Sequence, residues 1–479
     1  MFCNCILGAM ECILIIMRRI VLSFSLFSAV MVFGHPLDRA WVKGVTDRDP
    51  LSYGIGERMT FTLTVEDVAD TLPEGEYFLH WTRSGDDGLR EEGQVPLDGK
   101  PFVYATQIAK AGFVRLQAHV ADRNGKKYRK PFTGDTSTPA GKAAKRIFER
   151  TNSVFFDGGA GAAVETLQTE PEPKDFDAFW AKQFARLDRV PIKADRVEID
   201  SPNPKVRLYA VRVDCAGLRP VTGYLGVPKA VDEGKTFPAR LKTEGYSGRS
   251  CTQDAVTRVP DDELFLRINA HGLKLVEFGA TEADTKALRW EIGSHDAKAS
   301  YQGYAFDEQQ NADPETAYFN GMVLRVKRAL QYLKTLEGWN GRDLIASGGS
   351  QGGLQTVWAA ACGEGVTRAE PYVTWCCDMY TSGKLRRDKS LKLAADGWYV
   401  PWVEALGYYD AAIFAKRIPK TCHVNVTRVG LGDYCCPPTG LAKFWNNIPG
   451  NKEIHWMQGS QHDYEPPAYE GRDFVRKVD

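Results

Sequence analysis

A serine flanked by glycines is the residue of this 479-residue sequence whose setting points most directly to chemistry. Ser350 lies in the run 348–352 (GGSQG), between an apolar strand-like segment and the helix-like segment 354–361. A strand, a sharp turn and a helix in this order form a nucleophile elbow, in which the hydroxyl is exposed above a sheet. The pattern predicts Ser350 as the nucleophile of an acyl transfer, with Gly348 and Gly352 leaving room for the turn.

A serine hydroxyl needs a histidine as its base, and in this kind of fold the histidine follows the serine in the chain. Three histidines follow Ser350. His423 and His455 fall within predicted strands, whereas His462 lies in a loop just beyond the last predicted strand. We therefore expect His462 to be the base.

The acid of such a triad is expected at the end of the preceding strand. The predicted strand 424–431 stops just before Asp433, so we expect Asp433 to orient the imidazole and to stabilise its protonated form. Asp463 is the alternative, but a residue adjacent to His462 cannot easily turn its carboxylate back to the ring.

The negative oxygen that forms during acyl transfer needs hydrogen-bond donors. The start of the helix after Ser350 offers the backbone N–H of Gln351, where the helix dipole also favours negative charge. The loop after the predicted strand 239–243 offers the N–H of Tyr246. The alternative is that Gly245 and Gly248 in this loop only form a turn.

The segments around these residues alternate between strand and helix patterns from an amphipathic helix at 175–187 onward. This predicts an α/β protein with a mostly parallel, doubly wound sheet. A long helix is expected after the pair Asp313-Pro314, with Asp313 as its N-cap. The expected strands are 206–213, 221–226, 239–243, 273–278, 343–347, 372–375, 424–431 and 453–457.

A different pattern precedes this unit. Apolar residues alternate with polar ones over 59–66 and 114–120, which predicts a small antiparallel β-sandwich of immunoglobulin-like type over residues 35–135. The aromatic residues Tyr77, Trp81 and Phe102 could form a sugar platform, although such residues are more often core. Residues 136–170 are rich in glycine, alanine, proline and threonine and are expected to be a linker before the domain 171–479.

The first 34 residues have the layout of a secretory signal peptide, with Arg18 and Arg19 before an apolar run that ends in small residues. Met17 is the expected true start. The alternative, a membrane anchor, needs about 20 apolar residues, and the run is shorter. We therefore expect no stable membrane span and export to the periplasm or the medium. Some of the remaining cysteines could then pair, but their connectivity cannot be deduced.

Composition excludes several classes of partner and cofactor. Lys plus Arg and Asp plus Glu are 61 each, so no net charge attracts a polyanion, and nucleic acid is not expected as a partner. The sequence contains no C-x-x-C or H-E-x-x-H motif, so we expect no metal and no other cofactor. The vicinal pairs at 376–377 and 435–436 are interpreted as structural.

Four segments together resemble the acetyl xylan esterase / cephalosporin-C deacetylase family of α/β-hydrolases. They are 244–246 (EGY), 348–353 (GGSQGG), 433–438 (DYCCPP) and His462, in the family's order. In that family the corresponding patterns are roughly H-G-Y, G-x-S-Q-G-G, D-x-x-C-P-P and G-H-E. The sequence departs from them at Glu244 and at the run 461–463 (QHD).

The resemblance implies an α/β-hydrolase fold and a secreted serine esterase that removes acetyl groups from xylan or other acetylated oligo- or polysaccharides. It implies Ser350, Asp433 and His462 as the triad and the N–H groups of Tyr246 and Gln351 as the oxyanion donors. Two alternatives remain: a serine peptidase or another acyl-ester hydrolase of this superfamily, and a carbohydrate-binding protein on an inactive scaffold. A prolyl-oligopeptidase-type propeller would show repeats of about 40 residues, and none is present.

Overall fold

The computed structural model describes residues 35–68, 72, 75–170, 172–246, 256, 258–292, 303–394 and 397–479. The predicted signal peptide, residues 1–34, lies outside them, as do Gly248 and Cys251. Among the described residues, no helix is long and apolar enough to cross a bilayer.

The N-terminal unit consists of two antiparallel sheets, as predicted. Met59, Phe61 and Leu63 of one strand are buried and the threonines between them are less so, because alternate residues point to opposite faces of a sheet. One sheet has the order β1 (Trp41–Thr46), β2 (Met59–Glu66), β5 (Phe102–Thr106). The other has the order β4 (Glu91–Pro96), β3 (Tyr77–Gly85), β6 (Gly112–Asp122), β7 (Phe155–Ala162).

Aromatic residues of this unit pack between its sheets. The ring of Trp81 lies 5.7 Å from that of Phe102 and 4.7 Å from that of Tyr104, and all three pack against the buried core of the sandwich. The Tyr104 hydroxyl donates to Glu91 at 2.6 Å. These contacts favour the core interpretation of Trp81 and Phe102 over a sugar platform.

The C-terminal unit is built on one large mixed sheet, and the predicted α/β-hydrolase fold is confirmed. Within the described residues the sheet has the strand order β17 (Asp473–Val478), β16 (Lys452–Met457), β15 (His423–Gly430), β14 (Arg368–Tyr372), β13 (Trp339–Gly349), β11 (Phe237–Thr243), β12 (Leu264–Ile268), β10 (Val221–Pro228), β9 (Val206–Val213), β8 (Ala194–Ile199). The six strands from β16 to β12 in this order run parallel, and antiparallel strands follow on both sides.

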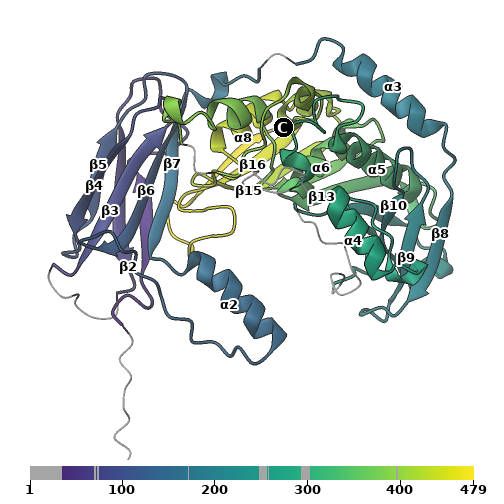
Figure 1. Ribbon diagram of the computed structural model, residues 1–479, viewed down its shortest axis with the longest axis horizontal. Helices are drawn as coiled ribbons and strands as arrows, with labels where there is room; N and C mark the ends of the chain where they lie inside the picture. The colour runs from purple at the N-terminus through teal and green to yellow at the C-terminus, as the bar shows by residue number, and fades with distance from the viewer. Residues whose placement is uncertain are drawn as a thin grey trace, which may run out of the picture.

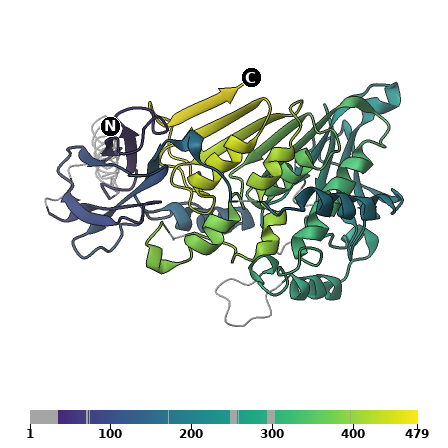
Figure 2. The same ribbon diagram turned by 90° about the horizontal axis from the view of Figure 1, so that it is seen from above.

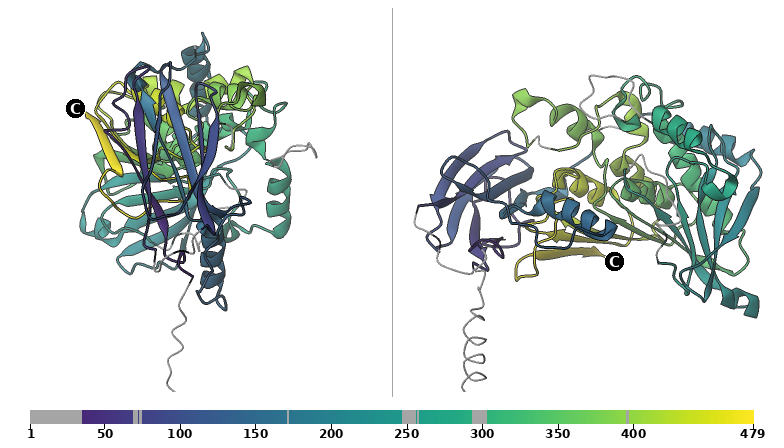
Figure 3. Two further views of the ribbon diagram at one scale, coloured as in Figure 1. Left: turned by 90° about the vertical axis from the view of Figure 1, so that its left-hand side faces the viewer. Right: turned by 60° about the horizontal axis from the view of Figure 1, so that its bottom comes forward.

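The sandwich lies beside the β15–β16 end of the large sheet, and β8 and β9 lie at the far end (Figures 1 and 3). The C-terminal strand β17 forms the outer edge of the sheet (Figure 2). The helices are α2 (Pro139–Thr151), α3 (Phe176–Asp188), α4 (Glu282–Glu291), α5 (Tyr318–Leu333), α6 (Gln351–Ala361), α7 (Ala411–Phe414) and α8 (Pro438–Asn447). Helix α8 contacts both β15 and β6 and so joins the two units.

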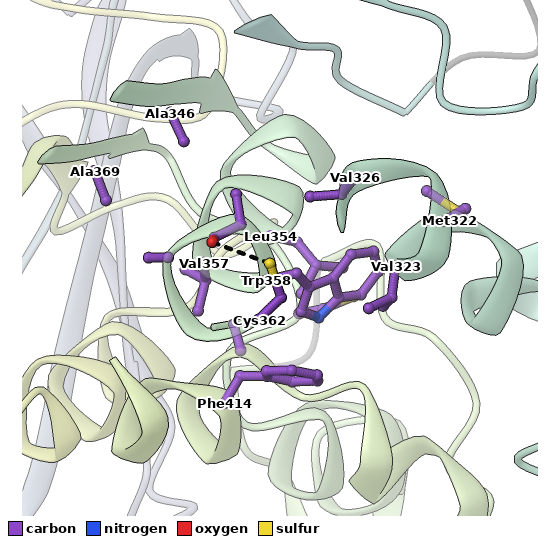
Figure 4. Packing of buried hydrophobic residues seen from close by; sticks show 14 of the residues in the cluster. Met322, Val323, Val326, Ala346, Leu354, Val357, Trp358, Cys362, Ala369 and Phe414 are labelled. Atoms are coloured by element: carbon purple, nitrogen blue, oxygen red, sulfur yellow. Dashed lines mark hydrogen bonds between the residues drawn. The ribbon is translucent and has the colours of Figure 1, made fainter. Parts of the chain in front are cut away.

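The helix that follows Ser350 is buried in the middle of the core. Leu354 and Trp358 of α6 are fully buried, and Val323 of α5 and Phe414 of α7 pack around them (Figure 4). The indole Nε1–H of Trp358 donates to the Tyr409 carbonyl at 3.0 Å, which satisfies its polar atom inside the core. This packing holds α6, and with it the turn at Ser350, rigidly against the sheet.

Three predicted elements differ from the structure. The predicted strand 372–375 lies too far along the chain, because β14 ends at Tyr372. The predicted strand 273–278 is wrong: Leu273 and Leu275 are buried in a loop that ends in a short 3₁₀ turn, and β12 is the strand of this region. The predicted helix begins later, at Tyr318, because the Asp313 carboxylate binds the Glu315 N–H at 2.8 Å and forms a separate turn.

The expected linker 136–170 is also different. It contains helix α2 and strand β7, which pairs with β6 and completes the sandwich. Glycines that predicted a loop allow close packing instead: a Cβ on Gly158 would lie 2.3 Å from Gln458 Oε1, and a Cβ on Gly159 would lie 2.5 Å from the Val114 carbonyl oxygen. The sandwich therefore extends to Ala162.

Candidate active site

Ser350 lies at a sharp turn between β13 and α6. Its backbone has a positive φ of 55° with ψ −119°, a conformation that a residue with a side chain adopts only when its surroundings impose it. A Cβ on Gly348 would lie 2.2 Å from Thr243 Oγ1, and a Cβ on Gly352 would lie 2.8 Å from the Thr243 carbonyl oxygen. Both predicted elbow positions therefore require glycine.

His462 reaches Ser350 from the loop after β16. Its Nε2 lies 3.1 Å from Ser350 Oγ, and its Nδ1 lies 2.9 Å from Asp433 Oδ2. With Nδ1 carrying the proton, the imidazole donates to Asp433 and accepts from the serine hydroxyl. The structure thus brings the three predicted triad residues into one hydrogen-bonded chain.

Asp433 follows β15 and is 2% exposed. Its Oδ1 accepts the backbone N–H groups of Cys435 at 3.0 Å and of Cys436 at 2.9 Å, so the carboxylate is held from both sides. Asp463 takes no such place: its carboxylate faces Arg150 of α2 at 3.5 Å on the surface.

The carboxylate of Asp433 controls the protonation of His462. Burial by itself lowers the pKa of His462, but the charge and hydrogen bond of Asp433 outweigh it and raise the pKa to about 9. The Asp433 carboxylate therefore favours the protonated form of the His462 ring, as its predicted role in the triad requires.

The loop that carries Tyr246 passes beside Ser350: a Cβ on Gly245 would lie 3.9 Å from Ser350 Cβ. The Tyr246 ring packs against Trp398 at 4.4 Å and Trp375 at 5.3 Å, which form an aromatic wall next to the elbow. Gln351 is the first residue of α6, where backbone N–H groups have no acceptor within the helix. The oxyanion role of the Tyr246 and Gln351 N–H groups stays a prediction.

Glu244, which stands where the family pattern has histidine, forms an ion pair with Arg267 of β12. The distance from Arg267 Nε to Glu244 Oε1 is 2.6 Å. The Glu244 carbonyl accepts from Gln355 Nε2 at 3.0 Å, which ties this loop to α6. The negative charge of Glu244 is thus neutralised by the positive charge of Arg267.

One group of side chains has the donor set of a metal site. The ligand atoms of Asp433, Cys435, Cys436 and His462 lie within 4.8 Å of one another. Metal binding needs a thiolate, whereas burial keeps the pKa of the Cys436 thiol well above its usual range, and His462 Nδ1 is already bound to Asp433. The group therefore suits the triad better than a metal.

Contacts from the sandwich reach this site, and the sequence did not predict them. Gln461 Nε2, next to His462, donates to Asp157 of β7 at 2.7 Å. Asp157 lies in the glycine-rich segment that resembled a linker, and no motif marks it as a neighbour of the site. The contact becomes visible only in the three-dimensional structure, where β7 pairs with β6 and Gln461 binds Asp157.

Comparison with protein families agrees with this geometry. A family model described as acetyl xylan esterase (AXE1) matches residues 164–476. The chain belongs to the acetyl xylan esterase family. The resemblance predicted from the four sequence segments is confirmed, and the matched residues contain all three members of the hydrogen-bonded chain.

A curated relative of this chain is also named as an acetyl esterase. The acetyl esterase Axe7A of Xylanibacter ruminicola is 26% identical over 286 residues, which cover 59% of this chain and 61% of that protein. The match thus spans less than two thirds of the length of this curated relative.

Two of the similar solved structures are also acetyl xylan esterases. The acetyl xylan esterase from Paenibacillus sp. R4 has a TM-score of 0.48 and 21% identity, with 62% of this chain and 93% of that chain covered. Acetyl xylan esterase 1 from Thermoanaerobacterium sp. JW/SL YS485 has a TM-score of 0.49 and 19% identity, with 63% and 92% covered.

The raised pKa of His462 gives a pH prediction. Only the neutral imidazole can take a proton, so we expect kcat/KM for p-nitrophenyl acetate, corrected for spontaneous hydrolysis, to rise with pH to a midpoint near 9. Asp433→Asn removes the charge that raises this pKa, so its midpoint should move to lower pH while kcat falls about a thousandfold or more. A wild-type midpoint at or below the ordinary histidine value of 6.5 would contradict the assignment.

Proposed function

We propose that this protein is a secreted serine carbohydrate esterase that removes acetyl groups from acetylated xylan or related saccharides. The observation that carries the proposal is the hydrogen-bonded chain from Ser350 Oγ through His462 to Asp433, with distances of 3.1 and 2.9 Å. Membership of the acetyl xylan esterase family supports the acyl group and the class of substrate.

The proposed reaction has two steps. His462 Nε2 takes the proton of Ser350 as Oγ attacks the acetyl carbonyl carbon, and the negative oxygen is stabilised by the N–H groups of Gln351 and Tyr246. The C–O bond to the sugar breaks, and His462 returns the proton to the leaving alcohol. Water, deprotonated by His462, then attacks the acetyl-serine. The C–Oγ bond breaks, His462 returns the proton to Ser350 Oγ, and acetate leaves.

The net charge of the chain supports an uncharged substrate. Equal numbers of basic and acidic residues leave no field that would gather a polyanion such as nucleic acid. An acetylated glycan without charged groups needs no such field.

Replacing the nucleophile gives the first test of the function. Ser350→Ala should lower kcat for acetate release by about a thousandfold or more, because no acetyl-enzyme can form. Wild-type enzyme quenched during turnover should carry one acetyl group on the peptide that contains Ser350, detected by mass spectrometry. Ser347→Ala is the matched control, since Ser347 is a nearby buried serine outside the hydrogen-bonded chain. Wild-type turnover by Ser350→Ala would refute the mechanism.

A substrate panel gives the second test. Acetylated xylo-oligosaccharides and acetyl esters should be hydrolysed with kcat/KM about tenfold or more above that for butyryl and feruloyl esters, because family membership implies a narrow acyl site, and the rings of Tyr246, Trp375 and Trp398 pack closely together beside the elbow. Peptide anilides should not be cleaved. Preference for a peptide or a long acyl chain would favour the peptidase or general esterase alternative, and xylan binding without turnover would favour the carbohydrate-binding one.

We also propose that residues 1–34 direct export and are removed. Their layout, with Arg18 and Arg19 before an apolar run, supports this. Expressed in a bacterium, the protein should appear outside the cytoplasm with a mature N-terminus near residue 35, as read by N-terminal sequencing. Changing Arg18 and Arg19 to Glu should retain the full-length chain in the cytoplasm. Cytoplasmic wild-type protein that keeps residues 1–34 would contradict the proposal.

A further inference from the structure

A buried ion pair lies where the sandwich meets the C-terminal unit, which is called the esterase unit below. Arg115 of β6 binds Asp157 of β7 through two parallel hydrogen bonds of 2.8 and 2.6 Å, and the two residues are only 3% and 1% exposed. A charged pair this deeply buried is costly to desolvate and needs further partners to satisfy it. Its partners come partly from the other unit.

These partners are the direct neighbours of the acid and the base of the triad. Gln461, which precedes His462, donates its Nε2–H to Asp157 Oδ2 at 2.7 Å. Tyr434, which follows Asp433, lies with its ring centroid 4.1 Å from the Arg115 guanidinium carbon. One Arg–Asp pair of the sandwich therefore touches both loops.

A second ion pair contacts the same loop. Arg386 is fully buried and forms an ion pair with Asp86 of the sandwich, whose carboxylate also accepts the Thr439 hydroxyl at 2.5 Å. The guanidinium of Arg386 lies 5.3 Å from the Tyr434 ring, so Tyr434 contacts two arginines. The Tyr434 hydroxyl has no hydrogen-bond partner among the described residues. The contacts of Tyr434 with the two arginines are therefore made by its ring.

The backbones of the two units also approach closely. Gln458 donates its Nε2–H to the Gly159 carbonyl at 2.6 Å and accepts the Gly159 N–H at 3.1 Å. A Cβ on Gly432 would lie 2.1 Å from the Asp157 carbonyl oxygen. The two loops that carry Asp433 and His462 are thus packed closely against β7.

We propose that Asp157, Arg115, Gln461 and Tyr434 are positioning residues through which the sandwich holds His462 and Asp433 in line with Ser350. The inference rests on the proposed esterase function, and it makes the N-terminal unit a part of the active site rather than an appended module. The family resemblance covers only the esterase unit, so the sandwich residues of this set lie outside the matched range of 164–476.

The size of the expected effect follows from geometry. A reacting group displaced by about 1 Å from its productive position can lose about a hundredfold in rate. A hydrogen bond to a charged group is stronger than one between neutral groups, so the bond from Gln461 to Asp157 holds the loop next to His462 in one position. Loss of the Gln461 contact should therefore reduce kcat and leave substrate binding nearly unchanged.

The first test compares two glutamines that bind the same carboxylate. Gln461→Met should lower kcat for p-nitrophenyl acetate by about tenfold to a hundredfold with KM nearly unchanged. Gln117→Met is the matched control, because Gln117 Nε2 also donates to Asp157 Oδ2, at 3.2 Å, but belongs to the sandwich. Wild-type kcat in Gln461→Met, or equal losses in both variants, would show that the contact is merely structural.

A second pair of variants tests the ring contact. Tyr434→Leu removes the ring on which Arg115 lies and should lower kcat. Tyr434→Phe keeps the ring and should have the kcat of the wild type. If both variants have wild-type kcat, or if phenylalanine rescues nothing, Tyr434 does not position Asp433.

A readout without substrate separates this inference from the proposed function. The His462 ring can be titrated by NMR in histidine-labelled protein, with its signal assigned from a His462→Gln variant. Gln461→Met should loosen the bond to Asp433 and so lower the pKa of His462, whereas Gln117→Met should leave it in place. An inactive wild type with this shift would refute the esterase function alone. An active wild type in which His462 titrates identically in both variants would refute the positioning.

Discussion

The positive φ of Ser350 is the constraint on which the rest of the site depends. With φ at 55°, this residue is strained by about 1–3 kcal/mol, and the surrounding structure must impose the conformation. Its N–H donates to the Tyr372 carbonyl at 3.0 Å, and its carbonyl accepts the Trp375 N–H at 3.1 Å, so β14 and the segment after it fix the turn from one side. The buried helix α6 fixes it from the other, and the hydroxyl is left facing His462.

The order of the parallel strands then explains how distant parts of the chain reach one serine. Carboxyl ends of parallel strands meet at one edge of a sheet, where active sites of open α/β proteins lie. Asp433 follows β15, His462 follows β16 and Tyr246 follows β11, so each comes to this edge from a different strand. Hydrogen bonds such as that from the Gly432 N–H to the Ser460 carbonyl at 3.1 Å join the loops that carry Asp433 and His462.

Sequence patterns were sufficient where local chemistry decides the structure. The elbow requires glycines at fixed offsets from Ser350, and apolar periodicity places most strands within a few residues. The patterns failed where contacts between distant segments decide. Residues 273–278 bury apolar side chains without being a strand, and Asp313 caps a turn rather than α5. Arg115 occupies a position that alternation would leave on the surface, yet it is buried, because the C-terminal unit covers that face of β6.

The thiols beside the triad bear on the proposed route of export. Cys376, Cys377 and Cys436 are buried and unpaired, and burial keeps the pKa of each thiol well above its ordinary value. Only thiolates exchange with disulfides and are oxidised readily. A folded chain delivered to an oxidising compartment would therefore keep these sulfurs reduced, provided that folding precedes oxidation. Speed of folding, rather than a disulfide at these three cysteines, would then preserve the active site in such surroundings.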